Sequence, residues 1–182
     1  AARRFSDCVA DVNTWMNRNR LKLNTDKTQI IWVGSRQQLA KLVSTDVTLG
    51  STTVGSSTTV VDLGFHLDNH LTMTAHVAHL SRSCYFQLRQ LRSVRRSLST
   101  DATISLIHAF VSSRLDYCNS LLYKISDGLL VKLQRIQNAA ARLVTGVRRW
   151  EHITPVLRRL HWLPVRSRIV FKIATVVYKC LH

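Results

Sequence analysis

The chain has 182 residues, 46% of them hydrophobic and only two of them proline, which excludes a disordered or fibrous protein and predicts a globular one. Its 26 Lys and Arg residues against 10 Asp and Glu give a formal net charge of +16 at pH 7. A small domain needs a net charge of no more than about 8 for solubility, so this surplus favours binding to a polyanion, with nucleic acid as the first candidate. A solvated basic surface and a membrane-surface protein are the alternatives.

The cysteines and the apolar runs indicate where the protein works. Cys8, Cys84, Cys118 and Cys180 lie far apart and form no Cys-x-x-Cys pair, and the N-terminus carries no secretory apolar segment. We therefore expect reduced thiols in an intracellular protein. No apolar run approaches the roughly 18 residues of a membrane span. Because an amphipathic pattern is already under way at Ala1, we expect the chain to be a piece of a longer protein.

The first part of the chain predicts one helix followed by strands. Residues 1–20 carry apolar side chains at three- and four-residue intervals, the spacing of an amphipathic helix. Residues 27–33 are rich in Ile, Trp and Val and predict a short strand, and the polar residues 35–45 predict a loop. Residues 46–68 are rich in Thr and Val with interrupting Gly and Ser. This pattern predicts strands joined by a tight turn, with Leu63-Gly64-Phe65 in the last strand.

The remainder predicts helices, the first over residues 73–97. At about 100° per residue its apolar side chains share one arc. They are Leu80, Cys84, Leu88, Leu91, Val94 and Leu98. Arg82, Arg89, Arg92 and Arg96 fall on the opposite arc, whereas Arg95 lies beside the apolar row. Tyr85 and Phe86 fall on or near the arginine side, where a nucleic acid or another protein element would pack.

Further helices follow. A second begins after Ser99-Thr100-Asp101, an N-cap cluster, and a third covers residues 127–145 and ends at Gly146. A short helix near 153–160 and a last one with Pro164 in its first turn complete the set. Phe110 and Phe171 are predicted to be core residues of these helices. The predicted fold class is α+β and mainly α, with a small α/β domain at 1–70 and a helical domain at 71–182.

The acidic residues and histidines predict no metal site. Metal-dependent phosphoryl transfer requires clustered carboxylates, and the ten acidic residues are scattered with no two adjacent. His66 and His70 lie four residues apart and His76 and His79 three apart, without a pair of cysteines. We expect surface histidines, with a zinc site as the alternative.

The basic residues predict a nucleic-acid interface. An arginine stripe opposite a leucine stripe turns one helix face to a core and the other to phosphates. The stripe of the first helix is repeated on the third, and more arginines follow between 148 and 168. The predicted phosphate-binding residues are Arg89, Arg92, Arg96, Lys132, Arg135 and Arg142. A purely solubilising surface remains the alternative for each of them.

Five stretches resemble, in order, the C-terminal part of the reverse transcriptases of LINE-type (non-LTR) retrotransposons. They are TWMNRNRLKLNTDKTQ, VDLGFHLDNHLT, SRLDYCNSLLY, LQRIQNAAARLVTG and HITPVLRRLHWLPVRSRIVFKIATVVYKCLH, and in this order they are distributed along nearly the whole chain. The resemblance implies that residues 1–34 are the end of the polymerase palm, with Lys27 as its motif D lysine. It also implies a primer-grip hairpin around Leu63-Gly64, followed by a helical thumb and its extension.

The resemblance also implies binding partners, and it implies that the catalytic metal-binding centre is missing from this chain. In this family the carboxylates that bind Mg²⁺ follow a Tyr or Phe in an Asp-Asp motif, which this sequence does not contain. We therefore expect no cofactor in this chain, Mg²⁺ in the complete enzyme, and an RNA template with a DNA primer as ligands. The upstream palm and fingers would be its protein partners, and a working element would act in the nucleus.

Three hypotheses stay open at this point. The first is a reverse transcriptase fragment that binds template–primer and lacks its own metal site. The second is a stand-alone basic helical module that binds RNA or DNA without catalysis. The third is a structural helical domain whose charge is incidental.

Overall fold

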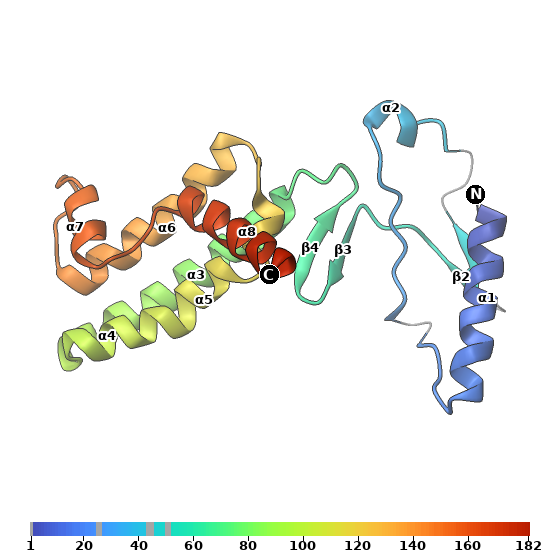
Figure 1. Cartoon of the computed structure of the whole chain (residues 1–182), viewed down its shortest axis with the longest axis horizontal. Helices are drawn as coiled ribbons and strands as arrows, with labels where there is room; N and C mark the ends of the chain where they lie inside the picture. Colours follow the sequence, from blue (N-terminus) through green and yellow to red (C-terminus); the bar gives the residue numbers. More distant parts are fainter. Residues whose placement is uncertain (1, 25–26, 43–45, 50–51) are drawn as a thin grey trace. The chain divides into compact units, whose positions relative to one another are not determined.

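The computed structural model of the chain describes residues 2–24, 27–42, 46–49 and 52–182 (Figure 1). The chain divides into two compact units, Ala1–Thr72 and Met73–His182. The predicted fold class is confirmed at the level of α+β, mainly helical. All described strands belong to the first unit, and the described secondary structure of the second unit is entirely helical.

The first unit contains two helices, two antiparallel pairs of strands and a small core. Its elements are α1 (Ala2–Arg18), α2 (Arg36–Leu39), β1 (Val47–Leu49), β2 (Thr52–Val54), β3 (Thr59–Asp62) and β4 (Phe65–Asp68). β1 pairs with β2 and β3 with β4, both antiparallel, and α1 packs against β1. Buried Ile30 and Val47 form the core, and Val9, Trp32 and Val54 pack against them. The predicted helix at 1–20 and the predicted strands at 46–68 are confirmed.

Two predictions between the helix and the hairpins are wrong. Residues 27–33 form no strand, and only Ile30 makes a β-bridge, parallel to Ser56. β-propensity produces a strand only where a neighbour extends the hydrogen-bonded ladder, and here the pairing is a single residue long. The loop predicted at 35–45 contains α2, because Ser35 and Gln38 form a reciprocal capping box. Residues 43–45 of that loop lie outside the described part of the chain.

The β3–β4 hairpin turns through Leu63 and Gly64. Asp62 pairs with Phe65, so the two residues between them are the turn. Their φ angles are +47° and +83°, the positive values that a type I′ turn needs to match the twist of paired strands. The prediction that both lie within the last strand is therefore wrong, although Phe65 does begin β4. The Leu63 side chain is 85% exposed in this turn.

The second unit is a helical bundle (Figure 1). Its α-helices are α3 (Thr74–Val94), α4 (Thr100–Ile107), α5 (Ser113–Asp116), α6 (Asp127–Thr145), α7 (Thr154–Arg159) and α8 (Val165–Leu181). α6 contacts α3, α4, α7 and α8, so it is the central helix of the bundle. The helices predicted over 73–97, 127–145 and 153–160 are confirmed. Within the described residues, no helix has both the length and the apolar character needed to cross a membrane.

The helix ends follow local rules with one small correction. The Ser99 hydroxyl accepts a hydrogen bond from the Ala102 amide at 3.1 Å and begins α4, as predicted. Gly146, with φ of +72°, ends α6, also as predicted. Pro164 is extended, with ψ of 150°, and stands just before α8 instead of in its first turn.

The core of the bundle lies where the apolar rows of α3 and α6 meet. The row of α3 is buried from Val77 to Leu91, and that of α6 from Leu129 to Val144. The predicted row of the first helix continues to Leu98. Val94 is instead 48% exposed and Leu98 only half-buried, because the α-helix gives way after Val94 to the 3₁₀ turn Arg95–Ser97.

Three predicted burial states are wrong. Phe110, expected in the core, is 39% exposed, because the π-helical turn His108–Ser112 places Val111 and Ser112 on the buried side instead. Phe171 is 64% exposed, because α8 turns other side chains inward, notably Val165 and Ile169. His76, expected at the surface, is buried among the core residues of α3.

Candidate nucleic-acid interface

A groove of about 970 Å³ lies between α3, α6 and the loop that follows α6. Five arginines line it: Arg92, Arg95, Arg135, Arg142 and Arg149. No acidic side chain is among its lining residues, all of which fall in the continuously described range 73–182. The groove is therefore a concentrated positive site within the bundle.

Helix geometry explains how three of these arginines meet. Arg135 and Arg142 are seven residues apart on α6, which is two helical turns, so they share one edge of that helix. Ile136 and Ala140, which stand between them in the sequence, are buried, and α6 packs against α3. Arg92 follows buried Leu91 at the corresponding edge of α3.

Arg95 builds one wall of the groove. Its Nε donates to the Leu143 carbonyl at 3.1 Å, and its Nη2 donates to the Val144 carbonyl at 3.0 Å. A third bond runs from Nη1 to the Leu98 carbonyl at 3.0 Å. The carbonyls of a last helical turn lack intrahelical donors and carry the negative end of the helix dipole, so a guanidinium is a well-matched partner. This role explains why Arg95 lies beside the apolar row and away from the other arginines.

Arg142 holds the loop after α6. Its Nη2 donates to the carbonyls of Arg149 and Glu151 at 3.3 and 3.2 Å, and its Nε lies 3.5 Å from the Arg148 carbonyl. The Arg148 amide in turn donates to Glu151 Oε1 at 2.8 Å. These contacts fix the loop that carries Arg149. Arg142 was predicted to contact phosphate, and in the structure it lines the groove with most of its donors engaged by the loop.

Three of the five guanidinium groups that line the groove make no hydrogen bond or ion pair within the described residues. The side chains of Arg92, Arg135 and Arg149 are exposed, and no hydrogen bond or ion pair joins them to another described residue. Guanidinium groups bind phosphate oxygens in a bidentate manner, and among the residues that line this groove no carboxylate competes for them. The groove can therefore neutralise and hold an anionic chain.

The structure separates the six predicted phosphate-binding residues into two groups. Arg92, Arg135 and Arg142 line the same groove. Arg89, Arg96 and Lys132 are exposed on the bundle but are not among its lining residues.

Arg149 and Tyr85 also line the groove and were not among the predicted phosphate-binding residues. Tyr85, predicted on or near the arginine side of its helix, lies seven residues before Arg92 and lines the same groove. Arg149 is one of the arginines noted after the third helix, and its place in the groove depends on how Arg142 holds its loop.

The other predicted site residues belong to the first unit. The Lys27 side chain is exposed, and its amide donates to the Asn24 carbonyl at 3.3 Å and to Asn24 Oδ1 at 3.1 Å. The Thr28 hydroxyl donates to the same carbonyl at 2.8 Å, so Asn24 organises the turn that presents Lys27. Asp26, which stands between Asn24 and Lys27 in the sequence, lies outside the described residues. Leu63 and Gly64 form the turn of the β3–β4 hairpin.

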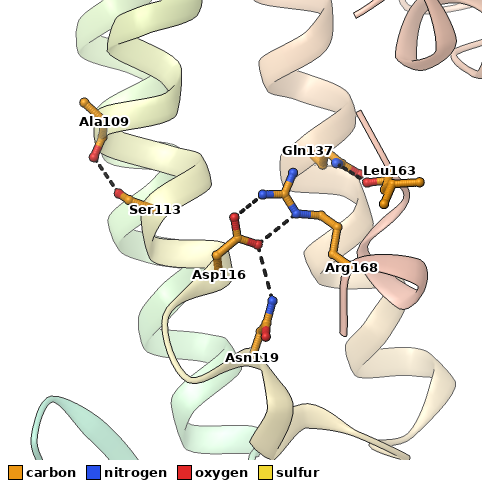
Figure 2. A network of polar contacts seen from close by, with 7 residues as sticks. All are labelled: Ala109, Ser113, Asp116, Asn119, Gln137, Leu163 and Arg168. Carbon is orange, nitrogen blue, oxygen red and sulfur yellow. Dashed lines mark hydrogen bonds and ion pairs between the residues drawn. The ribbon is translucent and has the colours of Figure 1, made fainter. Parts of the chain in front are cut away.

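A polar network anchors the last helix (Figure 2). Arg168 on α8 donates through Nε to Asp116 Oδ1 at 2.8 Å, and its Nη2 pairs with Oδ2 of the same carboxylate. The Asn119 amide donates to Asp116 Oδ1 at 3.3 Å, and Gln137 Nε2 on α6 donates to the Leu163 carbonyl at 2.7 Å. These bonds fasten α8 to the end of α5 and to α6, so Arg168 supports the scaffold and its charge is already paired.

The thiol of Cys84 lies buried in the helical bundle. Burial raises the pKa of the Cys84 thiol to about 11, against the opposing effect of the positive charge of Arg114. Cys8, Cys84, Cys118 and Cys180 are all free thiols. In the part of the chain that the structure describes, no group of three or more His, Cys, Asp or Glu residues is arranged to hold a metal ion.

No model of a known protein family, no curated protein and no solved structure matches this chain.

Proposed function

We propose that the chain is the C-terminal part of a LINE-type reverse transcriptase and that it binds template–primer nucleic acid. In this proposal the first unit is the end of the palm and the second is the thumb. The support from the sequence is the ordered series of five resembling stretches and the net charge of +16. The support from the structure is the basic groove between α3 and α6.

The observation that carries the binding proposal is the set of three uncommitted guanidiniums in one groove. Arg92, Arg135 and Arg149 face a common space without a competing carboxylate. A polymerase thumb must hold nucleic acid of any sequence, so its contacts should go to phosphates, which carry no base information. Three arginines without partners of their own meet that requirement.

The first unit would contribute to the same enzyme in two ways. Lys27, presented on the turn that Asn24 organises, would donate a proton to the departing pyrophosphate or neutralise its growing charge. The β3–β4 turn at Leu63 and Gly64 would act as the primer grip. The Mg²⁺ ions would be held by carboxylates of the upstream palm, and a working element would act in the nucleus.

Binding measurements over a range of salt concentrations test the proposal. Replacing Arg92, Arg135 and Arg149 together by Gln should flatten the plot of log K against log salt by about two to three units, since each lost phosphate contact removes about 0.9. A matched variant with Arg158, Arg159 and Lys179 replaced by Gln removes the same charge from exposed positions outside the groove. That control should change the slope by less than about one unit.

The comparison should use an RNA–DNA hybrid and duplex DNA, with helicity followed by circular dichroism. Equal slopes for the two triple variants would show that charge alone, and not the groove, attracts the nucleic acid. The genomic sequence just upstream separates the enzyme fragment from a stand-alone binding module. An open frame that encodes an Asp-Asp motif supports the enzyme, and a start codon immediately upstream supports the module.

A further inference from the structure

We propose that the groove between α3 and α6 takes unpaired nucleotides, whose bases stack on Tyr85 and Trp150 while their phosphates contact the arginines. This inference rests on the proposed function and specifies the form of nucleic acid that the groove accepts. It starts from two exposed aromatic rings, one inside the groove and one on the loop that borders it.

Tyr85 lies among the arginines of the groove. Its side chain lines the groove together with Arg92 and Arg135 and is 42% exposed. Within the described residues no hydrogen bond or ring contact engages this side chain, so its exposed part is open to a ligand. A half-exposed aromatic ring surrounded by cations is the combination that proteins use to bind single-stranded nucleic acid.

Trp150 directly follows Arg149, which lines the groove. Its side chain is 76% exposed, and the guanidinium carbon of Arg148 lies 5.3 Å from the ring centroid. The contacts of Arg142 with the loop carbonyls fix the segment that carries this pair. The loop therefore holds the large apolar ring of Trp150 exposed to solvent beside Arg148 and Arg149. An exposed ring held in this way is suited to stack against a base.

The chemistry of these rings selects an unpaired strand. In a duplex the flat faces of the bases are covered by neighbouring bases. A protein side chain that approaches the double helix from outside therefore contacts only phosphates, sugars and base edges. An unpaired base exposes a face that an aromatic ring can cover. The volume of the groove, about 970 Å³, is also of the order of sites that enclose small ligands, about 300–1,000 Å³. It can enclose a few nucleotides, whereas a double helix would meet the groove arginines with its backbone alone.

Three probes separate stacking from phosphate contact. They are an RNA strand of about 12 nucleotides, the same strand with abasic sugars in place of nucleosides, and an RNA–DNA duplex of equal length. The test variant carries Tyr85→Leu and Trp150→Leu, which keep apolar side chains and remove both rings. The control is Phe86→Leu, which removes a 55% exposed ring of α3 that does not line the groove.

We expect the double variant to bind the RNA strand at least about 10-fold more weakly than the parent chain. Its affinity for the duplex and for the abasic strand should stay within about twofold of the parent, because the phosphate contacts are intact. Phe86→Leu should match the parent on all three probes. In the unaltered chain, photocrosslinking to an RNA with 5-iodouridine should attach to Tyr85 or Trp150, a readout that does not depend on the folding of any variant.

Two outcomes would overturn the inference. One is an equal loss on the normal and abasic strands, and the other is a double variant that binds as Phe86→Leu does while crosslinks fall elsewhere. If the arginine triple variant still flattens the salt dependence in that case, the groove binds backbone alone and the proposed function stands. If neither set of variants alters binding to any probe, the proposed function fails together with the inference.

Discussion

The Nε atom of Arg95 lies 3.1 Å from the main-chain oxygen of Leu143, and this hydrogen bond joins the end of α3 to the last turn of α6. Two further carbonyls accept from the same guanidinium. We expect Arg95→Met to lower the free energy of unfolding by at least about 2 kcal/mol, because it keeps the aliphatic stem and removes a charged donor from partly buried carbonyls. Urea denaturation followed by circular dichroism measures the change.

Arg89→Met is the matched control for Arg95. Arg89 is exposed on the same helix, so its replacement should change the unfolding free energy by no more than about 0.5 kcal/mol. Indistinguishable denaturation midpoints for the two variants would mean that water replaces the Arg95 donors without loss.

The buried thiol of Cys84 predicts a stability that depends on alkaline pH. Its pKa is raised from 9.0 to about 11 by burial, with Arg114 opposing the shift. The unfolded thiol therefore ionises first as the pH rises, which favours the unfolded chain. The contribution is present in full below pH 9 and is lost between pH 9 and 11. Over that interval the parent should lose stability more steeply than Cys84→Ala, and parallel curves would contradict the assignment.

Regular features of this chain were predictable from sequence because their causes are local. α3 and α6 are long and strongly periodic, so their apolar rows identified both helices and most of their buried faces. Ser99 and Gly146 marked helix ends through their own hydrogen-bonding and backbone preferences. The same periodicity brought Arg135 and Arg142 to one edge of α6, which is why part of the candidate site was also predictable.

The predictions that were wrong or missing mostly concern residues whose structure depends on contacts with residues far away in the sequence. No local pattern around Arg95 indicates that two of its three acceptor carbonyls are 48 and 49 residues away. The segment around Ile30 has strand-like composition, but only the tertiary structure determines that it pairs at a single residue. Phe110 is exposed because it lies in a π-helical turn. The 3.6-residue period of an α-helix, on which its predicted burial rests, does not reveal such a turn. The capping box of Ser35 and Gln38 is a different case, since its local signal was present and overlooked.

The hairpin turn at Leu63 predicts opposite effects on stability and on binding. A leucine at φ of +47° is strained, whereas Asn tolerates that region and Asn-Gly is the preferred type I′ pair. Leu63→Asn should therefore stabilise the β3–β4 hairpin by about 1 kcal/mol, the lower end of the cost of a non-glycine residue in the left-handed region, measured as slower amide hydrogen exchange in β3 and β4. If the exposed leucine serves the proposed primer grip, template–primer affinity should fall in the same variant. An increase in both quantities would leave Leu63 without a role in binding.

Lys27 provides the test of chemistry in the proposed enzyme. The chain alone should incorporate no nucleotide, because its scattered acidic residues include no Asp-Asp motif. Fused to its upstream palm, it should extend a primer on an RNA template with Mg²⁺, and Lys27→Ala should slow single-turnover addition by about 10²-fold, the scale for losing a positioned acid. Template–primer affinity should change little, because the loss concerns the charge that develops on pyrophosphate. Lys22→Ala, which removes another exposed lysine of the first unit, is the control and should leave the rate unaltered. Equal rates for the two variants would make Lys27 an ordinary surface lysine whose turn serves only the fold.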